Sequence, residues 1–178
     1  SVHGFISLFA LSGDRLQELR TEWDSDLGMP TEMTSLLAAD IDTDGRIEII
    51  RGAANSTEHV TCWRGAEELW SHDTGEYPTT LCSIPGNSIL AGSRSGWVLL
   101  ISPAGEILHR LYAGETINCG ATLEDQFIVG GRSGGLFQLD TNSGQLTLLR
   151  RFSSSVEKMA AIRGRLYVFM ESGEFFIG

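Results

Sequence analysis

A short acidic run is the part of this sequence whose residue types and spacing are best suited to chemistry. Within "AADIDTDGRIEII" (38–50), carboxylates alternate with other residues and a glycine follows the third of them: Asp40, Asp42, Asp44, Gly45 and then Glu48. A loop that folds back points such alternating side chains inward, and carboxylate oxygens are ligands that calcium prefers. Without a cation, four carboxylates in one loop repel one another. The spacing therefore favours a structural calcium site formed by Asp40, Asp42, Asp44, Glu48 and the backbone carbonyl of Arg46.

The same run does not fit the calcium loop of an EF-hand. With Asp40 as position 1, position 12 is Arg51, a cation where an EF-hand has a bidentate glutamate. The residues that follow the loop, "RIEII" (46–50), read as a strand and not as a helix. The plain alternative is an Asp-rich turn whose side chains bond to their own backbone, with Arg46 or Arg51 balancing the charge.

The elements that must position this loop are revealed by an internal repeat. The stretch "ILAGSRSGWVLLIS" (89–102) matches "FIVGGRSGGLFQLD" (127–140), and "LYVFMESGEFFIG" (166–178) follows the same outline. The Ser-Gly pairs of these stretches lie 38 and 39 residues apart. A period near 40 that contains several short apolar runs is typical of a propeller blade.

Each repeat reads as four short strands, so the sequence predicts an all-β propeller of about four to five antiparallel blades. One domain covers 1–178, with blades expected at 1–23 (partial), 32–72, 78–112, 115–152 and 154–178 (partial). Residues 14–23 carry a helix-compatible spacing of apolar residues, but the repeat assigns them to a strand. Either the chain closes a five-bladed ring, or it is a fragment of a larger propeller whose open edges favour association between copies.

Two stretches resemble known propeller repeats. "AADIDTDGRIEIIRG" (38–52) resembles the FG-GAP repeat of integrin-type propellers, although Glu48 stands where that family more often has aspartate. "LFQLDTNSGQLTLL" (136–149) resembles the repeat of quinoprotein-like (PQQ-like) propellers, with Ser143 in place of threonine and Leu149 in place of the docking tryptophan. The first resemblance implies a calcium loop between the first two strands of a blade, and the two together resemble propellers of scaffold proteins.

Composition narrows the range of partners. Thirteen basic against 23 acidic residues give a net charge of −10, which repels phosphate backbones, so no nucleic-acid partner is expected. No apolar run is long enough to span a bilayer, so membrane insertion is not expected either. Cys62, Cys82 and Cys119 cannot all pair and fit no common zinc spacing, which favours a cytoplasmic location.

Candidate catalytic groups are few. Ser71, His72 and Asp73 are consecutive, and neighbours in a strand point to opposite faces, so they do not form a catalytic relay. Trp70 is expected to pack between blades. For Trp97 the sequence does not decide between packing and stacking against a ligand. The sequence thus predicts a non-catalytic scaffold for an unidentified protein partner. The alternatives are a quinoprotein-like or polysaccharide-acting enzyme and a multivalent carbohydrate-binding lectin.

Overall fold

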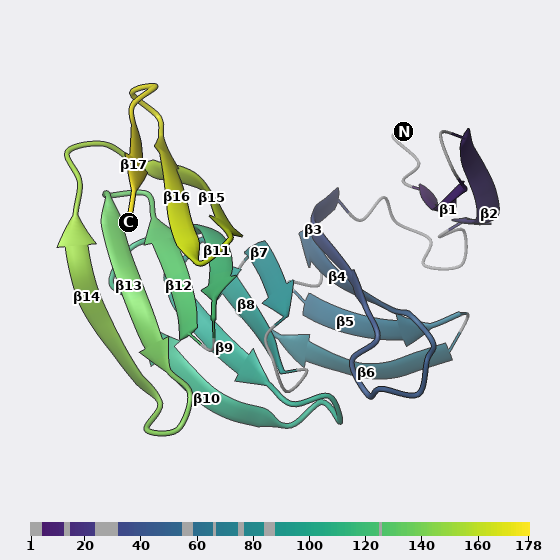
Figure 1. Cartoon of the computed structure of the whole chain (residues 1–178). Helices are drawn as coiled ribbons and strands as arrows, with labels where there is room; N and C mark the ends of the chain where they lie inside the picture. The colour runs from purple at the N-terminus through teal and green to yellow at the C-terminus, as the bar shows by residue number, and fades with distance from the viewer. Residues whose placement is uncertain are drawn as a thin grey trace.

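The computed structural model of the chain describes residues 5–12, 15–23, 32–54, 59–65, 67–74, 77–83, 88–124 and 126–178. All regular structure within these ranges is β-strand, and all of it lies in antiparallel sheets, which confirms the all-β prediction (Figure 1). The first two strands, β1 (Phe5–Ser12) and β2 (Arg15–Trp23), pair with each other. Residues 15–23 therefore form a strand, as the repeat predicts. Among the described residues, no helix has the length and hydropathy needed to cross a bilayer.

Four further sheets follow the order of the chain, each with its strands side by side in sequence order. The first contains β3 (Glu32–Ala39), β4 (Glu48–Ala54), β5 (His59–Arg64) and β6 (Glu67–Asp73). The second contains β7 (Pro78–Ser83), β8 (Ile89–Ser93), β9 (Trp97–Ile101) and β10 (Ile107–Tyr112). The third contains β11 (Ile117–Leu123), β12 (Gln126–Gly131), β13 (Gly135–Asp140) and β14 (Gln145–Arg151). The last has three strands, β15 (Val156–Ile162), β16 (Arg165–Met170) and β17 (Phe175–Ile177).

The sheets stack so that their first strands lie together. Strand β7 contacts β3 and β11, and β11 contacts β15. Figure 1 shows these first strands toward the middle of the molecule, with β6, β10 and β14 on its outside. Four-stranded meanders whose first strands face a common centre are the arrangement of propeller blades.

Apolar clusters fill the space between consecutive sheets. Ile50 of β4 packs with Leu99 of β9, Leu90 of β8 with Phe127 of β12, and Ile128 of β12 with Val168 of β16. Side chains that are adjacent in a strand point to opposite faces, and both faces of the middle sheets are covered. This explains why their second strands read as continuous apolar runs in the sequence.

A repeated glycine sets how closely the sheets approach one another. In each of the last four sheets the first strand has a register shift at the same place, for example between Pro78 and Thr80. The residue at that shift lies against a glycine in the second strand of the preceding sheet. A Cβ added to that glycine would lie only 2.9 Å from the neighbouring Cβ in three pairs: Gly52 and Pro78, Gly92 and Ile117, Gly130 and Val156.

Hydrogen bonds from fourth strands also join neighbouring sheets. The Trp70 Nε1–H donates to the Pro103 carbonyl at 3.2 Å, and its ring lies against Gly105. His109 Nε2 lies 2.9 Å from the Thr141 carbonyl of the next sheet. The prediction that Trp70 packs between sheets is thus confirmed. Trp97 instead packs within its own sheet, with its ring centroid 5.1 Å from that of Tyr112.

Candidate functional site

The carboxylate loop, defined as residues 40–48, connects β3 to β4, and one of its apolar side chains is buried in the core. Ile41 is only 1% exposed and belongs to the cluster between the first two four-stranded sheets. The backbone turns through left-handed conformations at Thr43 (φ 62°) and Gly45 (φ 85°). Burial of Ile41 and the two left-handed residues leave the aspartates gathered at the surface end of the sheet.

The aspartates of the loop accept hydrogen bonds from its own backbone. Asp40 Oδ2 accepts from the Gly45 N–H at 3.0 Å and Asp42 Oδ1 from the Asp44 N–H at 3.2 Å. Asp44 Oδ1 accepts from the Arg46 N–H at 2.8 Å. Such side-chain-to-backbone bonds shape a turn without help from an ion. This part of the Asp-rich-turn alternative is confirmed.

Glu48 is the most enclosed acid of the loop. Its side chain is 0% exposed, and its Oε2 accepts from the Ile41 N–H at 3.0 Å. Its other oxygen, Oε1, lies 2.8 Å from Nε of Arg64. A buried carboxylate is costly unless it is both paired and hydrogen-bonded, and Glu48 meets both conditions.

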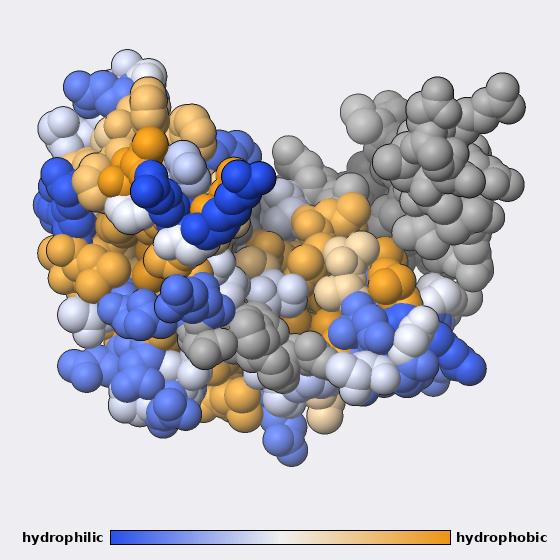
Figure 2. All heavy atoms as spheres, viewed as in Figure 1, coloured by the Kyte–Doolittle hydropathy of each residue, from blue (hydrophilic) through white to orange (hydrophobic). Residues whose placement is uncertain are grey.

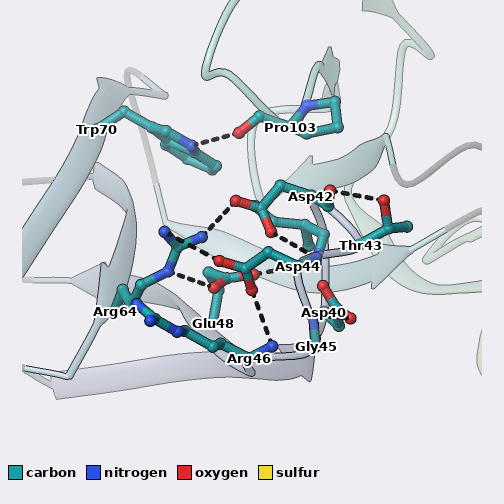
Figure 3. Close-up of polar contacts among 11 residues, drawn as sticks. Asp40, Asp42, Thr43, Asp44, Gly45, Arg46, Glu48, Arg64, Trp70 and Pro103 are labelled. Atoms are coloured by element: carbon teal, nitrogen blue, oxygen red, sulfur yellow. Dashed lines mark hydrogen bonds and ion pairs between the residues drawn. The ribbon is translucent and has the colours of Figure 1, made fainter.

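Arg64, at the end of β5, places its guanidinium among three carboxylates (Figure 3). Besides Glu48, its Nη2 bonds to Asp42 Oδ2, and its Nη1 lies 3.6 Å from Asp44 Oδ2. Strand pairing explains this position: Ile49 pairs with Trp63, so Arg64 lies opposite Glu48 across the two strands. The planar, forked guanidinium suits several carboxylates at once.

The Asp-rich-turn alternative names Arg46 or Arg51 as the cation that balances the charge. The structure adds a cation that the sequence analysis did not name, Arg64, which lies 16 residues after Glu48 and bonds to it. Arg46 is exposed, and its contact with Asp44 is through the backbone N–H. The signal that identifies Arg64 is the register between the second and third strands of the sheet, which lies outside the loop motif.

The contacts shift the acid–base properties of this group. The hydrogen bond from Arg64 is the main cause that lowers the pKa of Asp42 below its usual value of 3.8. Conversely, hydrogen bonds to Glu48 and Asp42 raise the pKa of Arg64. The four carboxylates of the loop, together with the guanidinium groups of Arg46 in the loop and of Arg64, leave two negative charges in excess. An additional cation would therefore be attracted to the loop.

Three of the five predicted calcium ligands lie close together. Asp40, Asp42 and Glu48 each offer an oxygen, and these oxygens all lie within 4.8 Å of one another. Asp40 Oδ1 is buried and has no hydrogen-bond partner among the residues that the structure describes. Asp44 instead lies beside Arg64. The oxygen donors suit calcium in type, but Arg64 already bonds to the oxygens of Asp42 and Glu48.

The side chains of the "SHD" run (71–73) do not point toward a common site, as strand geometry predicts. The structure gives Ser71 a different partner. Ser71 Oγ lies 3.1 Å from Nδ1 of His59, which is on the paired strand β5. His72 points instead toward the next sheet, with its Nε2 2.5 Å from the Gly105 carbonyl. The Ser71–His59 contact is exposed to solvent, where hydrogen bonds stabilise a developing charge much less than in an enclosed site.

The cysteines are unpaired thiols. Cys62 and Cys119 are buried, and burial raises the pKa of each to about 12. A thiol with such a pKa stays protonated near neutral pH and is neither a good nucleophile nor a good metal ligand. These side chains act as small members of the apolar clusters.

Comparisons with known proteins support the fold. No protein-family model and no curated protein matches the chain. Sqt1 of Saccharomyces cerevisiae superposes with a TM-score of 0.78 at 14% identity, over 98% of this chain and 53% of Sqt1. The computationally designed Ika4 protein gives 0.72 at 18% identity, over 85% of this chain and 92% of Ika4. The designed Ika8 protein gives 0.71 at 20% identity, over 92% of this chain and 49% of Ika8. The chain thus spans about half the length of Sqt1 and of Ika8.

Proposed function

We propose that this chain is a non-catalytic scaffold of the propeller type that binds a protein partner, and that its carboxylate loop has a structural role. The observation that carries the proposal is the stacking of the sheets through apolar clusters, which holds turns and strand edges on a rigid frame. Loops on such a frame are well suited to recognition. The net charge of −10 makes a nucleic-acid partner unfavourable.

The scaffold proposal is tested by site-specific photocrosslinking. A photoreactive residue is placed in turn at exposed Ile107, Leu149 and Phe175 of the full chain, which is then incubated with extracts. We expect a photoreactive residue on one face only to crosslink to a single protein with a fixed stoichiometry. An excess of unlabelled chain should prevent this crosslinking. Equal labelling from all three sites contradicts specific binding. Turnover of a polysaccharide, or of an alcohol after addition of a quinone, would overturn the non-catalytic assignment.

Two forms of the ring remain compatible with this proposal. A ring closed by the chain itself is supported by Ika4, of which the match covers 92%. A segment of a larger ring is supported by Sqt1 and Ika8, of which it covers 53% and 49%. Small-angle scattering combined with the solution mass separates them: a closed monomer gives the compact dimensions of a globular domain, whereas an open arc gives a larger radius of gyration or associates.

Calcium binding by the carboxylate loop is a second proposal, in keeping with the FG-GAP resemblance. Its ligands would be the side chains of Asp40, Asp42, Asp44 and Glu48 with the Arg46 carbonyl. Asp40 Oδ1, for which the described part of the chain offers no partner, and the excess negative charge favour it. Because Arg64 bonds to oxygens of Asp42 and Glu48, calcium and Arg64 would compete for the same atoms.

This competition gives the calcium proposal a clear test. Calorimetric titration of metal-free protein should show calcium binding by the wild type and tighter binding by Arg64→Gln, which frees the oxygens. Asp40→Asn, whose side chain has no contact with Arg64 in the structure, should lose the binding. Absence of binding in both the wild type and Arg64→Gln would overturn calcium binding and leave the scaffold proposal intact.

A further inference from the structure

Aromatic and cationic side chains gather where strand β10 ends, on the outside of the second four-stranded sheet. Trp97 and Tyr112 lie opposite each other on β9 and β10, and their ring centroids are 5.1 Å apart. Arg110 precedes Tyr112 by two positions and so shares its face, with its guanidinium carbon 5.0 Å from the Trp97 ring centroid. A guanidinium held over a ring still has N–H groups for another partner. We call these three residues, with the turn 94–96 beside them, the rim corner.

The preceding sheet covers only part of the face on which the rim corner lies. Leu99, which pairs with Arg110, is 1% exposed and belongs to the apolar cluster shared with that sheet. Cover ends beyond Leu99, since Arg110 is exposed and Tyr112 is 61% exposed. The fourth strand of the preceding sheet reaches the other end of the β9–β10 hairpin, where Trp70 bonds to the Pro103 carbonyl. The rings and the cation of the rim corner are therefore accessible.

This exposure does not depend on where the chain begins or ends. The sheets on both sides of the rim corner are present, because β7 contacts β3 of the sheet before it and β11 of the sheet after it. A further sheet would pack on the first or the last sheet and would leave β10 on the outside (Figure 1). Figure 2 shows hydrophobic and hydrophilic surface side by side over the described part of the molecule, so a partner meets both kinds of group.

The equivalent corner of the third four-stranded sheet holds a carboxylate of the chain itself. Gly135 stands there in place of Trp97, and a Cβ on it would meet the Glu115 carboxylate. The Glu115 side chain is 5% exposed, and its Oε2 accepts from the Ser133 N–H at 2.6 Å. Its Oε1 lies 3.1 Å from Nη1 of Arg151, which pairs with Gly135 across the two strands. This corner of the repeat can thus hold a carboxylate between a turn N–H and an arginine.

The rim corner has such donors but no built-in carboxylate. Tyr77 stands 38 residues before Glu115, at the equivalent repeat position, and its ring centroid lies 5.7 Å from the guanidinium carbon of Arg94. The N–H of Ser95, at the turn position that donates in the third sheet, has no acceptor within the described part of the chain. Among the described residues, Arg94 and Arg110 form no ion pair with a carboxylate. These donors are available to a carboxylate from outside.

We propose that the rim corner binds a glutamate or aspartate side chain of a partner protein, in a segment that also carries apolar residues. The carboxylate bonds to an arginine and a turn N–H, as that of Glu115 does in the next sheet. The apolar neighbours pack on Trp97 and Tyr112, and tryptophan, tyrosine and arginine are the residues that most often dominate an interface. The net charge of −10 opposes this only weakly, because charges more than about 8 Å away are largely screened at physiological salt.

This inference rests on the proposed scaffold function and names its binding surface and the chemistry of its partner. Fluorescence anisotropy tests it with the full chain and labelled peptides of about eight residues. One peptide carries glutamates and leucines separated by serines, and its counterpart has glutamine at each glutamate. The glutamate peptide should bind about tenfold or more tightly, because hydrogen bonds to a charged group are stronger. Equal affinity for both peptides, or no binding of either at millimolar concentration, would overturn the proposal.

Arginine variants locate the bound carboxylate. Arg110→Gln should weaken binding of the glutamate peptide about tenfold and leave the affinity for the glutamine peptide unchanged. Its matched control is Arg163→Gln, which changes an exposed arginine in a turn of the last sheet and should bind as the wild type does. Both substituted side chains are exposed, so both variants should melt with the wild type. Wild-type affinity in Arg110→Gln would show that the carboxylate is not bound at the rim corner.

A carboxylate built into the chain provides a second, independent test. Tyr77→Glu places a glutamate at the repeat position of Glu115, where it can occupy the donors of the rim corner. This variant should bind the glutamate peptide about tenfold more weakly than the wild type. Tyr77→Gln, which lacks the charge, should retain the wild-type affinity. Equal affinities of the two variants would contradict the assignment.

Two other outcomes would contradict the inference alone. If the wild type forms dimers that Arg110→Gln makes monomeric, a second copy occupies the rim corner. If photocrosslinking captures a specific partner from Phe175 but never from Ile107, which lies on the same strand as Arg110, the scaffold binds through another face. Tighter binding of an oligogalacturonate than of the glutamate peptide would indicate an acidic carbohydrate and would overturn the proposed function as well. A lack of specific crosslinking from every site would also overturn that function.

Discussion

Arg64 and Glu48 form an ion pair across two strands, with the arginine Nε 2.8 Å from Oε1 of the fully buried glutamate. The same guanidinium bonds to Asp42, so one side chain from β5 ties together the beginning and the end of the carboxylate loop. A cation that belongs to the chain thus provides much of the charge balance that the loop motif had led us to assign to calcium. The polar contacts of the loop lie within its own sheet, whereas Ile41 packs in the apolar cluster shared with the next sheet.

Removing the charge of Glu48 should destabilise the protein while leaving its fold intact. Glu48→Gln preserves the shape of the side chain but places an amide N–H₂ against donors, so the free energy of unfolding should fall by about 2 kcal/mol. Urea denaturation followed by circular dichroism measures this loss. Glu68→Gln, an exposed site in the same sheet, is the control and should unfold as the wild type does. Equal midpoints for both variants would show that the buried pair does not stabilise the fold.

Acid should weaken the contact between Arg64 and Asp42 within a defined pH range. The pKa of Asp42 is lower in the folded state than its ordinary value of 3.8, so the folded state favours the ionised form. Its contribution to stability is therefore complete above pH 3.8 and is lost as the pH falls through the lower, folded pKa. The difference in unfolding free energy between the wild type and Asp42→Asn should be constant at neutral pH and shrink below pH 3.8. A difference that stays unchanged in acid would contradict this assignment.

The sequence is sufficient to predict features that depend on residues close together in the chain. The spacing of the Ser-Gly turns predicted the strand pattern, because each turn and the strands beside it are encoded within about ten residues. The bonds from loop backbone to Asp42 and Asp44 were predictable for the same reason. Arg64 was not predictable from the motif, because its place opposite Glu48 depends on the register between β4 and β5.

The contacts between sheets could not be predicted from the sequence pattern either. Gly92 and Gly130 repeat in the aligned stretches, yet the repeat does not show that the next sheet's first strand packs on them. The replacement of this glycine by Phe169 is visible in the alignment, but its meaning depends on that packing. The pairing of Ser71 with His59 likewise required the register between β5 and β6.

Substitution by alanine should therefore destabilise the protein to different extents at two equivalent positions. Gly130→Ala places a Cβ about where Val156 already packs, so it should destabilise the protein by about 1–3 kcal/mol. Phe169→Ala, at the equivalent position of the last sheet, changes an exposed side chain and should cost less than about 1 kcal/mol. Thermal unfolding of both variants measures the contrast. Similar losses would contradict the role given to the glycine.

Burial should protect the core thiols from modification. Cys62 is 0% exposed and its pKa is raised to about 12, so almost none of it is thiolate at pH 8. Iodoacetamide should leave Cys62 and Cys119 unmodified in the folded protein and alkylate both in urea, as peptide mass spectrometry would show. Rapid alkylation of Cys62 without denaturant would mean that the first apolar cluster opens readily.

The most direct test of the structural role of the loop is a thermal melt in the presence of EDTA. Arg64→Gln removes the cation that bonds to Asp42, Asp44 and Glu48, whereas Arg46→Gln changes the exposed arginine of the loop and serves as the matched control. The structure predicts that Arg64→Gln lowers the melting temperature by several degrees and that Arg46→Gln melts with the wild type. If Arg64→Gln melts with the wild type, or if the two variants are destabilised equally, Arg64 does not hold the loop.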